Sequence, residues 1–450
     1  MVPTVRRAGA FAVVGTLSFV APVLAGRIDA RVAMVAATLP FVLVALLALR
    51  AIDQDSALFE LFARPGDYEE GRLYGLAGFS LAAAGLALLA LRFGMPVAVY
   101  VATVLLLVVG VLAEAGTREV TADAFVATSA FAAGAFGAGV LGQLAVAMLD
   151  ASTSFDPPTA LFLAATGALL AALLRSMLFE RDDPLVMLTV GLVLWLFADL
   201  SLALDPTQVL VGLAITVVLG YVSYALETAS ITGMLAGVFL AFLTVILGSY
   251  GWLAVLVSFF GIGGLSTKFR YEEKRERGLA EGDDGARGSG NVLANSAVAL
   301  AAVLGAAMSS MVGLPEYVFF FAFSGAVAAA MGDTLSSEIG GLYDDPRLIT
   351  TLEPVRPGTD GGVTWQGVAA GLAGACVVAG IAAAFFGLGP IPALVIVIAG
   401  FAGMTVDSIL GATVESDAGV IDNQGVNFLA TLAGALVSGG LALAVGPVVL

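Results

Sequence analysis

The chain has 450 residues, of which 60% are hydrophobic and 12% are charged. In a soluble globular protein about 25% of the residues are charged. The composition therefore excludes an ordinary soluble protein. Histidine is absent and Cys376 is the single cysteine, which excludes an imidazole base, a histidine-ligated zinc and an intrachain disulfide. The net charge of −16 argues against a nucleic-acid partner, and an acidic chain with only Lys268 and Lys274 as lysines is typical of halophilic archaea.

Apolar segments long enough to cross a bilayer recur along the chain. A membrane helix needs about 20 mostly apolar residues, which predicts an all-α, polytopic helical bundle of about 15 spans, within roughly 13 to 16. The first segment follows Arg6 and Arg7 and is interpreted as a span rather than a signal peptide, because further apolar segments follow at once. The weakest, 250–265, could be half of a broken or re-entrant pair with its neighbour. The predicted spans are 8–25, 32–50, 73–91, 96–114, 124–149, 158–175, 184–204, 208–226, 231–249, 250–265, 291–312, 316–332, 364–386, 390–412 and 425–447.

Basic residues are concentrated in alternate connecting segments. If the N-terminus lies inside, the outer segments contain only Arg27, Arg31 and Arg92. Because cytoplasmic loops are enriched in arginine and lysine, we expect a multi-pass cell-membrane protein with its N-terminus in the cytoplasm. The loops 266–290, 333–363 and 413–424 would then all face the cytoplasm. The inner segments contain Arg6, Arg7, Arg64, Arg72, Arg118, Arg175, Arg181, Lys268, Arg270, Lys274, Arg275, Arg277 and Arg287.

The unusual polar motifs lie in the second half of the chain. Residues 1–204 contain no comparable motif, and their acidic loop 51–72 is interpreted as an ordinary connector. We therefore expect an N-terminal membrane module, 1–204, whose role the sequence does not define, and a catalytic membrane module, 205–450.

The segment 332–340 contains the first motif. On a helix, Asp333 shares a face with Ser337, and Thr334 shares a face with Glu338, because these residues are four positions apart. Two carboxylates among hydroxyl groups suit Mg²⁺, which prefers oxygen ligands and usually binds together with substrate phosphates. The alternative is a polar helix end capped by hydroxyl groups.

The second motif combines arginines with a turn rich in glycine. Arg347 precedes Thr350 and Thr351, and Arg356 precedes the turn 357–362, which contains Gly358, Thr359, Gly361 and Gly362. Consecutive backbone N–H groups in such a turn can bind an anion, and guanidinium groups can fork phosphate oxygens. The same turn could equally be a pair of tight turns without a ligand.

Three further motifs lie at the ends of predicted spans. Asp407, with Ser408, interrupts an apolar run, and an intramembrane carboxylate is by default a candidate for function, although it could also reach the interface. Asparagine pairs four residues apart can orient a phosphate or ribose, or can cap helices and bond neighbouring ones. The basic residues 268–277, including Lys274 and Arg277, are interpreted mainly as topology signals or lipid-headgroup contacts. The amide-containing motifs are Asn291 with Asn295, and Asp422 and Asn423 with Asn427.

These ordered blocks resemble the integral membrane family called domain of unknown function 92, which includes animal transmembrane protein 19 and the plant phytyl-phosphate kinase. The resemblance covers roughly 205–450 and leaves the N-terminal part outside. Ser336 stands where the family commonly has alanine, and the loop 413–424 is short compared with animal members. The blocks are 266–269, 291–295, 332–334 with 337–340, 347–351, 357–359 with 361–363, 407–408 with 410–412, and 422–423 with Asn427.

The resemblance implies a membrane kinase that transfers a phosphoryl group from CTP or another NTP to an isoprenyl monophosphate, such as geranylgeranyl or phytyl phosphate, to give the diphosphate. Asp333, Glu338 and Asp407 are expected to hold Mg²⁺, and Lys268, Arg347 and Arg356 to offset the charge that develops on the transferred group. The residues expected to bind nucleotide or substrate are Asn291, Asn295, Thr334, Ser337, Thr350, Thr351, Gly358, Thr359, Gly361, Gly362, Ser408, Asp422, Asn423 and Asn427.

Two other function classes stay open at this point. A CDP-lipid-forming cytidylyltransferase would use similar groups and would differ only in its product. A transporter of lipids or small molecules would also be polytopic, but it predicts polar groups scattered through the middle of the membrane in both halves. The expected partners are a nucleoside triphosphate, an isoprenoid lipid phosphate and membrane lipid, and the sequence leaves the oligomeric state open.

Overall fold

The structure is a computed structural model that describes residues 4–179, 182–200, 202–227, 229–279, 288–414 and 421–446. Its contacts divide the chain into two compact units, Met1–Leu213 and Ala214–Leu450. The boundary lies inside helix α11 (Pro206–Ala225), whereas the boundary predicted from the sequence, between residues 204 and 205, lies just before this helix. Two basic residues used to predict orientation, Arg181 and Arg287, lie outside the described residues.

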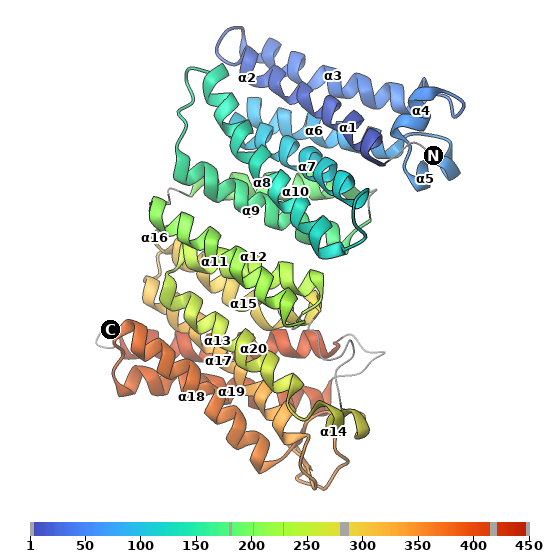
Figure 1. The fold of residues 1–450 in the computed structure, drawn as a ribbon. Helices are drawn as coiled ribbons and strands as arrows, with labels where there is room; N and C mark the ends of the chain where they lie inside the picture. Colours follow the sequence, from blue (N-terminus) through green and yellow to red (C-terminus); the bar gives the residue numbers. More distant parts are fainter. Residues whose placement is uncertain are drawn as a thin grey trace. The chain divides into compact units, whose positions relative to one another are not determined.

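The first unit is entirely helical where it is described (Figure 1). Aspartates begin several of its helices: Asp29, Asp123 and Asp156 each accept backbone N–H groups from the first turn that follows. Its core consists largely of alanine, valine, leucine and phenylalanine side chains. The elements are α1 (Thr4–Gly15), η1 (Thr16–Phe19), α2 (Val20–Leu24), α3 (Ala30–Arg50), α4 (Ala57–Phe62), α5 (Pro65–Glu70), α6 (Tyr74–Arg92), α7 (Val97–Arg118), α8 (Ala124–Leu149), α9 (Pro157–Met177) and α10 (Asp183–Asp199).

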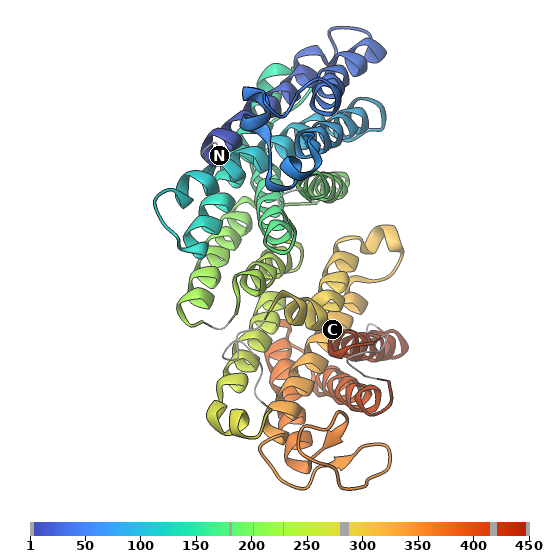
Figure 2. The same cartoon turned by 90° about the vertical axis from the view of Figure 1, so that its right-hand side faces the viewer.

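The second unit is built around one long helix, α17 (Glu316–Gly340). This helix packs against five other helices of the unit: α13 (Tyr250–Lys268), α15 (Ser289–Ala307), α18 (Trp365–Phe386), α19 (Pro390–Thr413) and α20 (Asn423–Val445). A short antiparallel hairpin pairs Arg347 with Val363, and Figure 2 shows this hairpin at one end of the unit. The remaining elements are α12 (Ile231–Leu247), α14 (Tyr271–Glu276), α16 (Ser309–Val312), β1 (Arg347–Leu348) and β2 (Gly362–Val363).

The prediction of a polytopic helical membrane protein is confirmed. Thirteen helices of the described chain are long and apolar enough to cross a membrane, which lies within the predicted range. The two predicted spans not among them, 184–204 and 231–249, correspond to the 17-residue helices α10 and α12. The segment judged weakest, 250–265, belongs to α13, a helix of 19 residues. The structure divides α12, of 17 residues, from α13, of 19 residues, at Gly248 and Ser249.

Small residues let α17 approach its neighbours closely. A Cβ atom added at Gly434 of α20 would lie 2.6 Å from the Gly325 carbonyl oxygen of α17. One added at Gly371 of α18 would lie 2.6 Å from the Gly332 carbonyl oxygen, also on α17. Because membrane helices associate through close backbone packing rather than through the hydrophobic effect, these contacts fix where the polar end of α17 lies.

We expect Gly434→Ala to destabilise the second unit by about 1–3 kcal/mol, because the added methyl group meets a backbone oxygen that cannot move alone. Gly440→Ala on the same helix is the matched control, since its Cβ would have no atom within 4 Å. Thermal unfolding of the two variants in detergent measures the difference. Equal melting temperatures would contradict the close packing of α17 with α20.

Candidate functional site

A polar cavity of about 430 Å³ lies within the second unit. Its walls come from α14, α15, α17, α19, α20 and the loop that carries β2, so segments far apart in sequence meet there. Fourteen of the site residues predicted from the sequence line it: Asn291, Asn295, Asp333, Thr334, Ser337, Glu338, Gly358, Thr359, Gly361, Gly362, Asp407, Ser408, Asn423 and Asn427.

Two carboxyl groups face each other in this cavity. Asp333 on α17 and Asp407 on α19 lie within side-chain hydrogen-bonding distance. The Oδ2 atom of Asp407 is buried and has no hydrogen-bonding partner among the residues that the structure describes. Two carboxylates this close repel each other unless a proton or a cation lies between them, so the pair is suited to bind a cation.

A buried lysine contacts the third predicted carboxylate. Lys274 of α14 is 2% exposed, and its Nζ atom donates hydrogen bonds to the carbonyl oxygens of Ser266 at 2.7 Å and Thr267 at 3.3 Å. It also forms an ion pair with the carboxylate of Glu338. Glu338 is therefore held by a cation of the protein itself.

Sequence reasoning interpreted Lys274 as a topology signal and missed its place in the cavity. The residue lies within a run of charged side chains, and five of the six residues of α14 are charged. What distinguishes Lys274 is its burial in the folded structure, because it is the buried residue of this helix. No periodicity in so short a helix distinguishes it from Arg275.

Side-chain amides occupy the ends of two helices in the cavity. Asn295 donates to the carbonyl oxygen of Asn291 at 3.0 Å, and Asn427 donates to the side-chain oxygen of Asn423 at 3.1 Å. Both donors are largely buried, at 7% and 8% exposed. Asp422 instead caps α20, since its side chain accepts the Gly425 N–H at 2.9 Å, and it does not line the cavity.

The glycine turn approaches α19 closely. Gly361 has a φ of +73°, and a Cβ there would lie 2.5 Å from the Ser408 carbonyl oxygen, so this position requires glycine. The N–H groups of Thr359 and Gly362 close two successive turns, with bonds of 3.1 and 2.8 Å. The segment is thus a pair of tight turns, and its backbone also lines the cavity from Gly358 onward.

Five other predicted residues do not line the cavity. Lys268 is exposed and donates to the Leu226 carbonyl oxygen at 2.8 Å, and Arg347 is exposed and donates to the Leu352 carbonyl oxygen at 2.8 Å. Lys268 is therefore bonded to backbone 42 residues earlier in the chain, and Arg347 to backbone five residues later. The remaining three, Arg356, Thr350 and Thr351, are exposed on the loop that continues into the cavity wall.

Comparison with known proteins identifies the family of the second unit. The family model described as integral membrane protein DUF92 matches residues 214–435. An uncharacterized membrane protein of Methanocaldococcus jannaschii, MJ0933, is 33% identical over 206 residues, which cover 46% of this chain and 82% of that protein. The chain belongs to the DUF92 family of integral membrane proteins. The matched segment nearly coincides with the second unit, which we call the DUF92 unit.

Two plant proteins are also similar to the chain. Protein PGR of Arabidopsis thaliana is 30% identical over 273 residues, covering 50% of this chain and 93% of that protein. The chloroplastic protein VTE6 of the same plant is 31% identical over 201 residues, covering 42% of this chain and 58% of that protein. No solved structure matches the chain.

The carboxylates of the DUF92 unit fit Mg²⁺ only in part. Within the described ranges, no group of three histidine, cysteine, aspartate or glutamate side chains is arranged to hold a metal ion. Asp333 and Asp407 are paired, whereas Glu338 is engaged by Lys274. Since Mg²⁺ commonly binds to only one or two protein carboxylates, the buried and unpartnered Oδ2 of Asp407 fits one position of such a cation.

We expect Lys274→Met to destabilise the DUF92 unit by about 3–5 kcal/mol, because it leaves the Glu338 carboxylate, whose side chain is 13% exposed, without its cation. Adding Glu338→Gln should recover part of this loss. The matched control is Arg275→Met on the same helix, whose partner Glu272 is 76% exposed, so little change is expected. Unfolding in detergent measures the stability of the two single variants and of the double variant. If the double variant is no more stable than Lys274→Met, the pairing of Lys274 with Glu338 is contradicted.

Proposed function

We propose that the DUF92 unit is a prenyl-phosphate kinase that transfers a phosphoryl group from CTP or another nucleoside triphosphate to an isoprenyl monophosphate. The observation that carries this proposal is the meeting of Asp333 and Asp407 in one cavity with Lys274, side-chain amides and a glycine turn. Such groups bind phosphates and a divalent cation together. The resemblance to a family that includes the plant phytyl-phosphate kinase supports the same reaction class.

The cavity has the size and polarity that this reaction needs. Its volume of about 430 Å³ falls in the range of roughly 300–1,000 Å³ typical of small-molecule sites. Its lining is rich in carboxylate, amide, hydroxyl and glycine residues, which suits phosphate and ribose groups rather than a hydrocarbon chain. We therefore place both phosphates in the cavity and the isoprenoid tail among the apolar helices.

The paired aspartates are assigned to the cation that accompanies the nucleotide. Bound there, Mg²⁺ would supply positive charge to the oxygens of the donor phosphates. Asp333 and Asp407 would hold it from two helices whose spacing is set by close packing. Glu338 is the least suited of the three predicted ligands, because Lys274 already neutralises it.

The remaining cavity residues are assigned to binding and orientation. Asn291 and Asn423, each bonded by a neighbouring buried asparagine, would orient phosphate or ribose oxygens. The turn from Gly358 to Gly362 would offer phosphate its backbone N–H groups other than those of Thr359 and Gly362, which close the two turns. Thr334, Ser337 and Ser408 line the same cavity. The phosphate acceptor is itself an anionic nucleophile, so the reaction needs no general base, which is consistent with a chain without histidine.

The exposed basic residues are assigned to nucleotide binding outside the cavity lining. Arg347 and Arg356 lie on the loop that enters the cavity wall, and Lys268 lies on α13 ahead of the helix that carries Lys274. From these positions they would contact the bound nucleotide at the cavity entrance, together with Thr350 and Thr351. The bias of arginine and lysine across the loops supports a cytoplasmic location for this end of the unit.

The direct test is an assay of the purified full chain in detergent with geranylgeranyl and phytyl monophosphates, Mg²⁺, and CTP, UTP or ATP labelled in the γ-phosphate. We expect labelled prenyl diphosphate with at least one nucleotide. A labelled pyrophosphate product together with a CDP-lipid would instead identify a cytidylyltransferase. If no acceptor and nucleotide pair gives a product from well-folded protein, the kinase proposal is wrong.

We expect Asp333→Asn and Asp407→Asn each to lower kcat/KM by about 100-fold or more, because each removes half of the paired negative charge without changing side-chain size. Both variants should also need a higher Mg²⁺ concentration for half-maximal activity. Such a rise would show that the defect is one of cation binding. Glu353→Gln, an exposed acidic residue outside the cavity lining, is the control and should retain activity. Full activity in both aspartate variants would overturn the cation assignment while leaving the reaction itself open to the assay above.

A further inference from the structure

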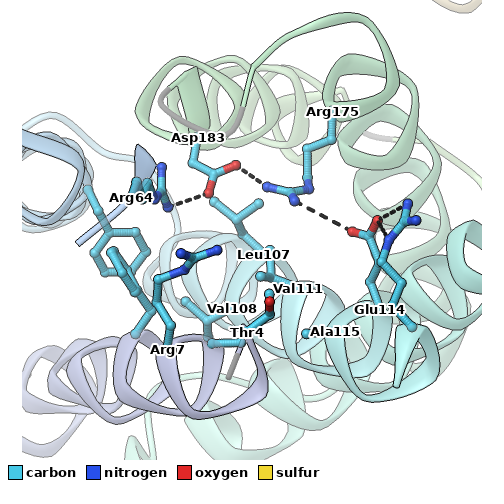
Figure 3. A pocket seen from close by; sticks show the side chains of 14 residues that line it. Thr4, Arg7, Arg64, Leu107, Val108, Val111, Glu114, Ala115, Arg175 and Asp183 are labelled. Carbon is cyan, nitrogen blue, oxygen red and sulfur yellow. Dashed lines mark hydrogen bonds and ion pairs between the residues drawn. The ribbon is translucent and has the colours of Figure 1, made fainter. Parts of the chain in front are cut away.

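Buried ion pairs occur in both units of the chain. In the first unit, Asp183 pairs with Arg64 at 2.6 Å and also with Arg175, so it connects distant segments of that unit (Figure 3). In the DUF92 unit, Lys274 pairs with Glu338. Here the anchored element is α14, a helix of six residues whose end lies at the polar cavity. The pair therefore also places whatever follows this helix.

The end of α14 fixes the residue that comes directly after it. The N–H of Gly278 donates to the Arg275 carbonyl oxygen at 3.1 Å, and the N–H of Leu279 donates to the Lys274 carbonyl oxygen at 2.8 Å. Gly278 has a φ of +71°. These are the two hydrogen bonds and the left-handed residue of a Schellman motif. Because one of the bonds joins Leu279 to the buried Lys274, anchoring the lysine also anchors the leucine.

The Leu279 side chain lies between two glycines of the cavity wall. A Cβ atom added at Gly358 would lie 2.4 Å from its Cδ2 atom, and one added at Gly341 would lie 3.2 Å from its Cδ1 atom. Both glycines line the cavity, as does Leu279 itself. The leucine therefore packs against the glycine turn on one side and against the end of α17 on the other.

The glycine turn is held from a second side by α19. A Cβ atom added at Gly361 would lie 2.5 Å from the Ser408 carbonyl oxygen and 2.4 Å from the Ala412 Cβ atom. The turn is thus enclosed between Leu279 and α19. Close packing on both sides leaves its backbone little room to move, so the leucine contributes to where the N–H groups of the turn lie.

An aliphatic side chain stands apart in this cavity. Of the described residues that line it, Leu279 and Val363 are aliphatic, and the others are polar or glycine. Val363 belongs to β2 and is paired with Arg347, whereas Leu279 belongs to no helix or strand. A leucine offers nothing to a phosphate or a cation, so its effect on the site acts through the turn that it contacts.

We propose that Leu279 is a positioning residue of the cavity. Held by the Schellman motif at the end of α14, it fixes the turn 358–362 so that the N–H groups of the turn lie where a substrate phosphate binds. This role rests on the proposed function, because phosphate is the ligand assigned to the turn. The placement of the turn itself does not depend on that assignment. Lys274 acts one step further away, through α14.

The first test is hydrogen–deuterium exchange of the ligand-free full chain in detergent. In Leu279→Ala we expect amides of residues 358–362 to exchange about tenfold faster, because the shortened side chain no longer supports the turn. Unchanged exchange at residues 320–330, in the core of α17, shows that the unit is folded. Leu279→Val replaces this variant if alanine prevents folding. Leu265→Ala, at a 68% exposed position outside the cavity lining, is the matched control and should exchange like the wild type.

The second test is kinetic and uses the kinase assay. Leu279→Ala should lower kcat/KM for the nucleotide about tenfold, because misplaced donors lose alignment with the phosphate. The Mg²⁺ concentration for half-maximal activity should not change, since Asp333 and Asp407 are untouched. Leu279→Met, of similar volume, should restore both exchange and activity.

Three results would overturn the positioning role of Leu279: unchanged exchange in the turn, a normal kcat/KM despite faster exchange, or a raised Mg²⁺ requirement, which would indicate general loosening of the cavity. If the wild-type chain has no kinase activity with any substrate pair, the proposed function fails. The exchange result then decides by itself whether Leu279 holds the turn in place.

Discussion

The close approach of α17 to its neighbours is the constraint on which the DUF92 unit depends. Glycines on α18 and α20 bring their backbones against the carbonyl oxygens of α17, so these helices have little freedom to slide or rotate. On α19, Gly400 and Gly403 lie against Ala328 and Ala329 of α17 in the same way. The polar ends of these helices are thereby held at fixed separations, and Asp333 and Asp407 meet as a consequence.

Two carboxylates brought together in a membrane protein are costly in free energy, and the structure shows how their charges are accommodated. Carboxylates at helix ends within a membrane protein are stable only when they are paired, hydrogen-bonded or able to bind a cation. Glu338 is paired internally with Lys274, which also bonds two carbonyl oxygens of α13. Asp333 and Asp407 instead face each other within hydrogen-bonding distance, so a proton or a cation bound between them would offset their repulsion.

The local parts of this arrangement were readable from the sequence, and the long-range parts were not. Spans follow from apolar length, and the pairs Asn291 with Asn295 and Asn423 with Asn427 follow from helical spacing, because both depend on neighbours in the chain. Lys274 was misinterpreted because its burial depends on α17, which lies more than sixty residues away. The position of Arg347 depends likewise on the pairing of β1 with β2, which places it opposite Val363, and residue spacing does not determine that pairing.

The lining of the DUF92 cavity determines what can enter it. Carboxylate, amide and glycine residues dominate this lining. Lys274, which also lines it, is already bonded to Glu338 and to two backbone carbonyl oxygens. A phosphate that entered alone would therefore meet negative charge, so its entry is favourable when a cation enters with it. The aspartate pair and a bound phosphate would then share one cation, and each would strengthen the binding of the other.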